Sequence, residues 1–99
     1  MVRINWTFQA KNDLKAIAEY IARDSRYYAK MQIIRIRNRT KIIKKYPRIG
    51  RIVPEIDNEI IRELIEGNYR IIYKIISDNQ IDILTIHHSA RDLGKKNIK

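Results

Sequence analysis

The stretch IIRELIEGNYRIIYKIISDNQIDILTIH, residues 60–87, determines the fold that the sequence predicts. It contains three runs that are rich in β-branched residues, at 60–65, 69–76 and 81–87, separated by the short polar segments EGN and SDNQ. Segments of this length and composition join neighbouring antiparallel strands. The stretch therefore predicts a three-stranded antiparallel meander.

Two amphipathic helices are expected before the meander. Thr7 is positioned to cap the first helix and Ser25 to cap the second, and Pro47 and Gly50 end the second helix. The first helix has one apolar stripe at helical spacing: Ala10, Leu14, Ile17, Ala18 and Ile21. The second has a narrower seam that suits packing on the first: Ala29, Ile33, Ile36, Thr40 and Ile43. The pair is predicted to form an antiparallel helix hairpin.

The N-terminal residues complete the predicted architecture. Residues 2–6, VRINW, alternate apolar and polar side chains, which is typical of an edge strand that joins the sheet. The predicted order is β-α-α-β-β-β, an α+β fold with the helix hairpin packed on one face of a small, mostly antiparallel twisted sheet. We expect residues 1–93 to form a single domain, followed by a flexible basic tail at 94–99.

Alternation along the middle strand assigns its two faces. Tyr69 and Tyr73 share one face and are expected in the core, whereas Arg70 and Lys74 share the face that the helices leave open. Arg70 is either a cation that faces a ligand or half of a cross-strand ion pair with Glu63. The neighbouring Arg62 and Glu63 are interpreted as a structural pair at the strand edge. Alternation in the last strand groups His87 with Ile83 and Thr85, and His88 with Leu84 and Ile86.

The excess positive charge lies in one segment. Of a net charge of +10, the whole excess falls between Arg23 and Arg51, which contain eleven basic residues and the single acid Asp24. This pattern predicts a surface for a polyanion or an acidic protein, although a lysine-rich solvated surface is the simpler alternative. Tyr27 and Tyr28 could add stacking contacts, but at least one of them is expected to pack at the helix start. The candidate partner-binding or nucleic-acid-binding residues are Arg35, Arg37, Arg39, Lys41, Lys44, Lys45, Arg48, Arg51 and Arg91.

Composition excludes several classes of function. The chain has no cysteine, so disulfides, thiolate catalysis and cysteine-based zinc sites are excluded. Adjacent histidines on a strand point to opposite faces, and three glycines form no phosphate-binding loop, so neither a metal nor another cofactor is expected. No apolar stretch approaches the roughly 20 residues that span a bilayer, and MVRINWTF is not a signal peptide. A cytoplasmic protein without membrane contact is expected.

Several segments of the chain together resemble a known superfamily. They are WTFQAKNDLKAIAEYIARDS, YPRIGRIVPE, IRELIEGN, YRIIYKI and ILTIHHSARDL, in this order. The chain thereby resembles the RelE/ParE superfamily of bacterial and archaeal toxins from type II toxin–antitoxin pairs. The resemblance implies a β-α-α-β-β-β domain that arrests growth of its host when a labile antitoxin is lost. It implies an antitoxin with an acidic amphipathic segment, and either a homodimer or a toxin–antitoxin hetero-oligomer.

The superfamily has two activities. ParE-like members, also described as plasmid stabilisation proteins, poison DNA gyrase, and DSRYYA, PRIGRIVPE and H-x-x-R-D-L in this chain are most similar to them. RelE-like members cleave mRNA on the ribosome. The resemblance therefore favours a gyrase and replication inhibitor that is not an enzyme. The first alternative is a metal-independent, ribosome-dependent mRNA endoribonuclease, and the second is an inactive relative that acts only as a binding module.

For the ribonuclease alternative, the resemblance nominates specific residues. Arg70 matches the arginine that contacts the scissile phosphate, and His88 is the histidine of the closing motif, with a pKa range that suits an acid or base. Lys74, Arg62 and Glu63 are weaker candidates on nearby strand positions. No tyrosine follows Tyr73, although the nucleases often have one after the last strand. This departure favours a structural hydrogen bond for His88.

Overall fold

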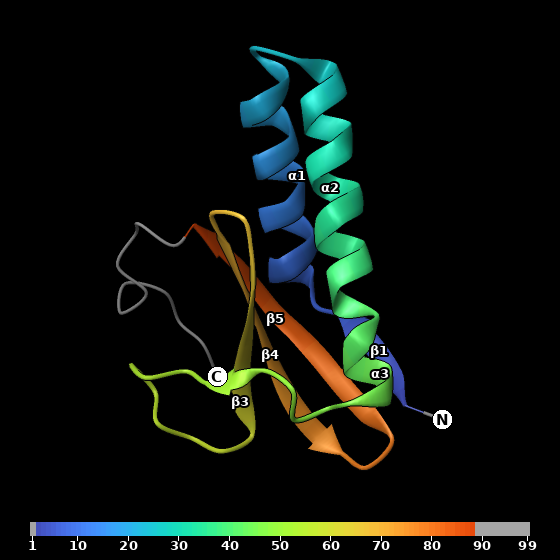
Figure 1. Ribbon diagram of the computed structural model, residues 1–99, viewed down its shortest axis with the longest axis vertical. Coiled ribbons are helices and arrows are strands. Elements are labelled where there is room, and N and C mark those ends of the chain that lie inside the picture. The colour runs from blue at the N-terminus through green and yellow to red at the C-terminus, as the bar shows by residue number, and fades with distance from the viewer. Residues whose placement is uncertain (1, 89–99) are drawn as a thin grey trace.

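The computed structural model describes residues 2–88 and contains a five-stranded sheet with helices before it. The elements are β1 (Arg3–Trp6), α1 (Phe8–Ala22), α2 (Arg26–Thr40), α3 (Ile42–Lys45), β2 (Arg51–Ile52), β3 (Ile61–Glu66), β4 (Tyr69–Ser77) and β5 (Gln80–His88). The strand order is β1-β5-β4-β3-β2, with β1 parallel to β5 and all other pairs antiparallel (Figure 1). The predicted fold class is confirmed. The predicted second helix is divided at Lys41 into α2 and α3, and the structure adds the short strand β2. Arg91 and the tail at 94–99 lie outside the described residues.

Both predicted helix caps are present. The Thr7 hydroxyl accepts a hydrogen bond from the Ala10 amide at 3.1 Å, and the Ser25 hydroxyl accepts one from the Tyr28 amide at 3.2 Å. Thr7 also donates from its hydroxyl to the Ile83 carbonyl at 2.7 Å. One side chain therefore starts α1 and attaches that start to β5. None of the helices within residues 2–88 is long and apolar enough to cross a bilayer.

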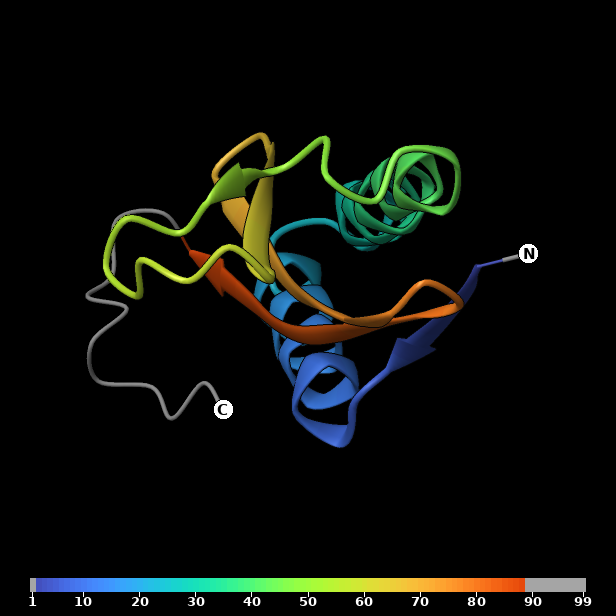
Figure 2. The same ribbon diagram turned by 90° about the horizontal axis from the view of Figure 1, so that it is seen from below.

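The main core lies between the helices and one face of the sheet (Figure 2). Its buried members come from α1, α2 and α3 and from β3, β4 and β5: Ala10, Leu14, Ile36, Ile43, Leu64, Ile71, Tyr73, Ile81, Ile83 and Ile86. Tyr69 packs against this cluster, so the predicted core positions of Tyr69 and Tyr73 are confirmed. Asp13 on α1 accepts hydrogen bonds from the Thr85 hydroxyl and from the Ile86 amide, which joins α1 to β5 beyond the end of β1.

The tip of the helix hairpin extends past the sheet (Figure 1). Tyr27 and Tyr28 lie at this tip, 66% and 65% exposed, with their rings edge-to-face at 5.5 Å between centroids. The prediction that one of them packs at the helix start was wrong. The prediction fails because, among the described residues, no strand packs against this end of α2. The ring contact of each tyrosine is therefore with the other tyrosine.

The second face of the sheet is covered by the chain between β2 and β3. Val53, Ile61 and Ile72 form a separate buried cluster, against which Ile56 and Ile60 pack. The helices do leave this face open, as predicted. The loop covers its middle, while Ile65 and Ile76 on the same face stay 46% and 45% exposed. This face therefore has an apolar cover of its own, and Arg70, which lies on it, is only 7% exposed.

A bulge in β5 changes the predicted faces of the last strand. Thr85 pairs with Ile72 and Ile83 pairs with Tyr73, so Leu84 is an extra residue without a partner in β4. Ile83 and Ile86 consequently both face the helices, while Leu84 packs against the second cluster. Strict alternation had placed Leu84 with Ile86 and Ile83 with His87, and both assignments were wrong because an added residue inverts the alternation.

Tyr73 holds the end of the basic segment against the sheet. It is fully buried, and its hydroxyl donates to the Pro47 carbonyl at 2.8 Å and accepts from the Gly50 amide at 2.9 Å. A Cβ at Gly50 would lie 2.6 Å from the Glu63 carbonyl oxygen and 2.7 Å from the tyrosine hydroxyl. Only glycine therefore allows the backbone at position 50 to lie this close to β3 and to the Tyr73 hydroxyl. Burial raises the pKa of Tyr73.

Replacing Tyr73 with phenylalanine tests this attachment. Tyr73→Phe leaves a buried carbonyl and a buried amide without a partner, so the free energy of unfolding should fall by about 1–3 kcal/mol in urea denaturation. The matched control is Tyr46→Phe, because Tyr46 is 52% exposed. Its unfolding free energy should stay within about 0.5 kcal/mol of the wild type. Equal losses in both variants would contradict the assigned role of the Tyr73 hydroxyl.

Candidate functional site

A network of two arginines and two glutamates lies on the second face of the sheet. The side chains of Glu63 and Arg70 are buried in it, whereas those of Arg51 and Glu55 are 64% and 42% exposed. Arg70 Nε donates to Glu63 Oε1 at 2.6 Å, and its two terminal nitrogens donate to the carboxylate oxygens of Glu55 at 2.7 and 2.8 Å. The other oxygen of Glu63 accepts from Arg51 Nε. The network, Arg51–Glu63–Arg70–Glu55, thus connects β2, β3, β4 and the loop that follows β2.

The network is electrically balanced. Hydrogen bonds from Arg70 lower the pKa of Glu55 to about 2, and hydrogen bonding to Glu55 and then to Glu63 raises the pKa of Arg70. The Glu63 side chain is fully buried and that of Arg70 is 9% exposed, so two charges have been removed from water. A desolvated charge is tolerated only when its partners are held in place. Two cations and two carboxylates satisfy this requirement and leave no net charge.

The network determines what Arg70 can do. The predicted ion pair with Glu63 is confirmed, and Glu55 adds a second, bidentate pair that sequence reasoning missed. A phosphate at Arg70 would have to displace these carboxylates. The only sequence indication of the second pair was an acid at Glu55 in the segment before the meander, and nothing in the local pattern placed that loop on the sheet.

The interpretation of Arg62 and Glu63 as a pair was wrong. Adjacent residues on a strand point to opposite faces, so the two side chains diverge from β3. Arg62 lies on the helix side, where it donates to the backbone carbonyls of Glu59 at 2.9 Å, Gly50 at 3.0 Å and Arg48 at 3.2 Å. It therefore orders the backbone around β2 while Glu63 binds the two network arginines.

The structure separates the two leading ribonuclease candidates. Arg70 pairs with His87 across β4 and β5, and Tyr69 pairs with His88. Arg70 and His88 consequently lie on opposite faces of the sheet, with the His88 ring edge-to-face against Tyr69 at 5.5 Å. Lys74 is half-buried on the Arg70 face, opposite Asp82. The histidine beside Arg70 is the buried His87, which alternation alone had not nominated.

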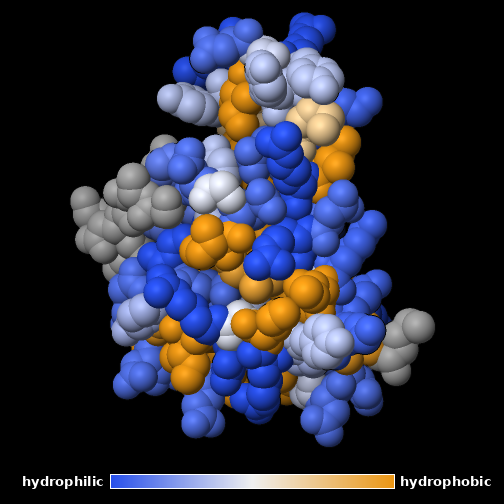
Figure 3. All heavy atoms as spheres, viewed as in Figure 1, coloured by the Kyte–Doolittle hydropathy of each residue, from blue (hydrophilic) through white to orange (hydrophobic). Residues whose placement is uncertain are grey.

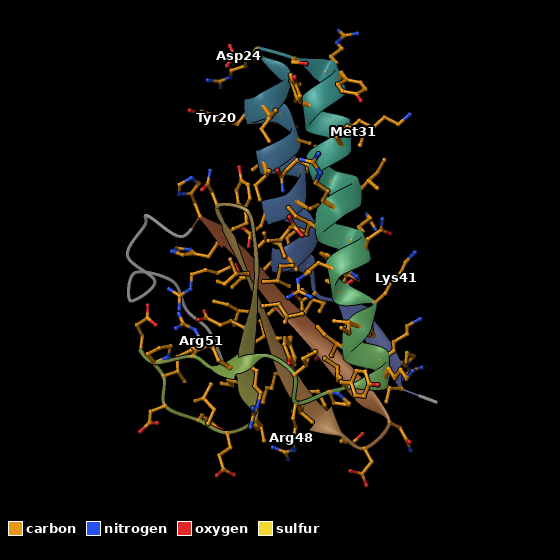
Figure 4. All side chains as sticks on the ribbon, viewed as in Figure 1. Tyr20, Asp24, Met31, Lys41, Arg48 and Arg51 are labelled. Carbon is orange, nitrogen blue, oxygen red and sulfur yellow. The ribbon has the colours of Figure 1, made fainter. Side chains whose placement is uncertain are left out.

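The predicted basic residues differ in their surroundings. Arg39 donates to the Ile65 carbonyl at 3.3 Å, and Arg51 is part of the network. Arg91 is outside the described part of the chain. The others are exposed on α2, α3 and the loop after them, and none forms an ion pair within residues 2–88: Arg35, Arg37, Lys41, Lys44, Lys45 and Arg48. Figure 4 shows Lys41 and Arg48 pointing outward from well-separated positions.

An apolar groove lies where α3 leads toward β2. It has a volume of about 660 Å³ and is lined by Lys45, Tyr46, Pro47, Arg48, Ile49, Ile75, Ser77 and Asp78. Tyr46 and Ile49 are 52% and 45% exposed. Figure 3 shows apolar surface interrupting the hydrophilic surface over the lower half of the molecule. We call this feature the apolar groove, and its rim carries the cations Lys45 and Arg48.

Within residues 2–88 no three His, Cys, Asp or Glu side chains are grouped so that they could hold a metal ion. The described site residues therefore comprise a closed charge network, an apolar groove and exposed cations.

Comparisons with known proteins agree with the fold. A chain of the chromosomal ParDE toxin–antitoxin system of P. aeruginosa has a TM-score of 0.73 at 23% identity, with 89% of this chain and 96% of that chain covered. A chain of the YoeB–YefM complex of Staphylococcus aureus has a TM-score of 0.55 at 19% identity, with 89% and 97% covered. In sequence, Toxin RelE2 of Caulobacter vibrioides is 30% identical over 91 residues, which are 92% of this chain and 99% of the relative.

The fold, with a helix hairpin packed on a five-stranded sheet, and these similarities define a toxin of the RelE/ParE superfamily. Residues 4–93 match the family model for the ParE toxin of the type II toxin–antitoxin system parDE. The chain therefore belongs to the ParE toxin family. The superfamily resemblance that the sequence carries is confirmed.

A charge-removing substitution tests the network. Glu55→Gln keeps the shape of the side chain but removes its charge. Because this side chain is 42% exposed and solvent screens its charge, the free energy of unfolding should fall by about 0.5–1.5 kcal/mol at pH 7. The folded-state pKa of Glu55 is depressed from its ordinary 4.5 to about 2, so its contribution is complete above pH 4.5 and disappears as the pH falls toward 2. In urea unfolding across this pH range, the free energies of unfolding of the wild type and of Glu55→Gln should converge as the pH falls.

The matched control is Glu59→Gln, since Glu59 is exposed and its side chain forms no ion pair within residues 2–88. A pH-independent difference for Glu55→Gln would contradict the assignment.

Proposed function

We propose that this ParE-family toxin arrests growth by inhibiting DNA gyrase. The observation that carries the proposal is the family match over residues 4–93, because the ParE-like branch is the one that poisons gyrase. The neutralised state of Arg70 supports it. Both carboxylates of the network hold the cation that the ribonuclease alternative requires, so the proposal assigns that cation a structural role.

The chemistry of RNA cleavage supplies a second argument. In-line attack by a ribose hydroxyl needs a base, an acid and cations around one phosphate. Arg70 and His88 lie on opposite faces of the sheet, so they do not surround a common point. The similarity to a toxin named RelE2 nevertheless makes ribosome-dependent mRNA cleavage the second candidate. An experiment must therefore follow both targets.

Purified protein should inhibit gyrase-catalysed negative supercoiling of a relaxed plasmid and should leave mRNA on translating ribosomes uncut. His88→Ala should retain both the gyrase inhibition and the growth arrest, because this proposal gives His88 no chemical role. The relevant readouts are gel mobility of the plasmid and primer extension on the mRNA. Cuts in mRNA without an effect on supercoiling, lost in His88→Ala, would replace this proposal with the ribonuclease.

We further propose that the partner is a cognate antitoxin whose acidic amphipathic segment binds the apolar groove. Tyr46 and Ile49 offer exposed apolar surface, and Lys45 and Arg48 supply cations at the rim. An amphipathic helix inserts apolar anchors into such a groove while its acidic side chains meet the rim. Asp78 is the one acid in the lining. It would repel an acidic side chain, so an acidic segment should bind with its carboxylates directed toward Lys45 and Arg48.

Substitutions of two equally exposed isoleucines test the groove. Ile49→Asp should weaken binding of the proposed acidic antitoxin by tenfold or more, roughly 1.4 kcal/mol, because it places a charge in the apolar surface. Ile65→Asp is the matched control, since Ile65 is 46% exposed on β3 against 45% for Ile49. Calorimetry should give near-wild-type affinity for the control. Equal effects of the two substitutions would exclude the groove, and an association rate that does not fall with added salt would exclude charge steering.

A further inference from the structure

A second surface, on the side of α2 that faces β1, is dominated by positive charge. Two shallow depressions share Arg37 there. One lies between the helices, with Lys11 and Lys15 at its wall, and the other lies between α2, α3 and β1, with Lys41 and Lys44 at its wall. We call these five residues, Lys11, Lys15, Arg37, Lys41 and Lys44, the basic flank.

The helices arrange the basic flank in two rows. Arg37, Lys41 and Lys44 follow one another at steps of four and three residues, and Lys41 keeps helical backbone angles of φ −63° and ψ −29° between α2 and α3. At a rise of about 1.5 Å per residue this row spans about 10 Å, and Lys11 and Lys15 are spaced by about 6 Å on the neighbouring helix. The cations therefore form a compact patch with regular spacing.

No acid balances the basic flank. The linings of both depressions contain no aspartate or glutamate, and none of the five cations forms an ion pair within residues 2–88. Arg37 lies over the Trp6 ring, 5.4 Å from its centroid, which fixes one cation in the middle of the patch. Like charges this close repel, so their arrangement calls for an anionic partner.

The apolar content of the flank distinguishes between kinds of anion. Leu14 and Thr40 beneath it are buried, and Ile34, 40% exposed, is its one strongly exposed large hydrophobic residue among those described. An amphipathic acidic helix would find few apolar contacts there, in contrast to the apolar groove. Single-stranded nucleic acid is bound by exposed aromatic rings, but Trp6 is half-buried under Arg37 and the exposed tyrosines lie elsewhere. A duplex backbone needs only cations.

We propose that the basic flank binds the sugar–phosphate backbone of duplex DNA without sequence preference. Duplex DNA carries one negative charge per about 3.4 Å of each strand, so a patch of about 10 Å faces roughly three phosphates of one strand. The flank is separate from the apolar groove and from the charge network. This DNA binding does not depend on the proposed effect on gyrase and is measured without gyrase or antitoxin.

The test uses the full-length toxin and a short fluorescent DNA duplex of mixed sequence, with anisotropy measured between about 50 and 200 mM KCl. The flank variant is Lys15→Gln/Lys41→Gln/Lys44→Gln. The control variant is Arg3→Gln/Arg23→Gln/Arg26→Gln, which removes the same charge from exposed positions that line neither depression. The flank variant should bind about tenfold or more weakly than wild type at about 100 mM salt, and its salt slope should be smaller by about 2–3. The control should stay within about threefold of wild type.

A second measurement does not depend on variants. Duplex DNA should protect Lys15, Lys41 and Lys44 of the wild-type toxin from acetylation, as followed by mass spectrometry, while Lys74 on the sheet stays reactive. Absence of DNA binding at the lowest salt, equal weakening of both variants, or equal protection of all four lysines would overturn the proposal. Stronger binding of a single-stranded RNA or of an acidic amphipathic peptide, lost only in the flank variant, would assign the flank to that ligand instead.

Discussion

The burial of Arg70 constrains much of this structure. A guanidinium that is almost removed from water in the middle of a sheet requires carboxylates in fixed positions, because desolvation of an unpaired charge costs several kcal/mol. Glu63 is supplied by the adjacent strand, but Glu55 comes from the loop after β2. That loop must therefore lie on the second face of the sheet, where Val53, Ile61 and Ile72 form a cluster of their own. Arg51 completes the balance at Glu63 and joins β2 to the same site.

Because Arg70 on the second face of the sheet is already bound by carboxylates, the surfaces that remain available to partners lie on the helix side. The strand that would present a catalytic arginine instead presents a neutralised one, with His88 on the other side of the sheet. The exposed features are then the apolar groove with its basic rim and the basic flank of α1, α2 and α3. They differ in chemistry, since one offers exposed Tyr46 and Ile49 and the other offers unbalanced cations. In the scheme that we propose, the apolar groove binds the protein partner and the basic flank binds a polyanion.

Local patterns in the sequence predicted most of the fold because the determinants of its elements are local. Thr7 and Ser25 cap the helices as expected, and period-2 alternation identified the helix-facing side of β4. Alternation failed at Leu84, where a bulge is set by pairing with β4 and by packing, neither of which a single strand reveals. The candidate site was predictable only in part. The Arg70–Glu63 pair follows from adjacent strands, whereas Glu55 reaches Arg70 through a loop whose path depends on tertiary contacts. The basic segment was evident from composition. Only the structure shows that its cations belong to three separate features: the Arg70 network, the rim of the apolar groove and the basic flank.

The most direct test of this account is the titration of the Glu55 carboxyl carbon by NMR in the wild-type toxin. If the Glu55 carboxylate accepts hydrogen bonds from Arg70 in solution, the pKa of Glu55 lies near 2, far below the ordinary 4.5. A site-specific titration is preferable to a global stability measurement because it reports on this contact alone. A pKa near 4.5 would mean that the loop leaves Arg70 open, and it would return that arginine to the list of residues available for a phosphate.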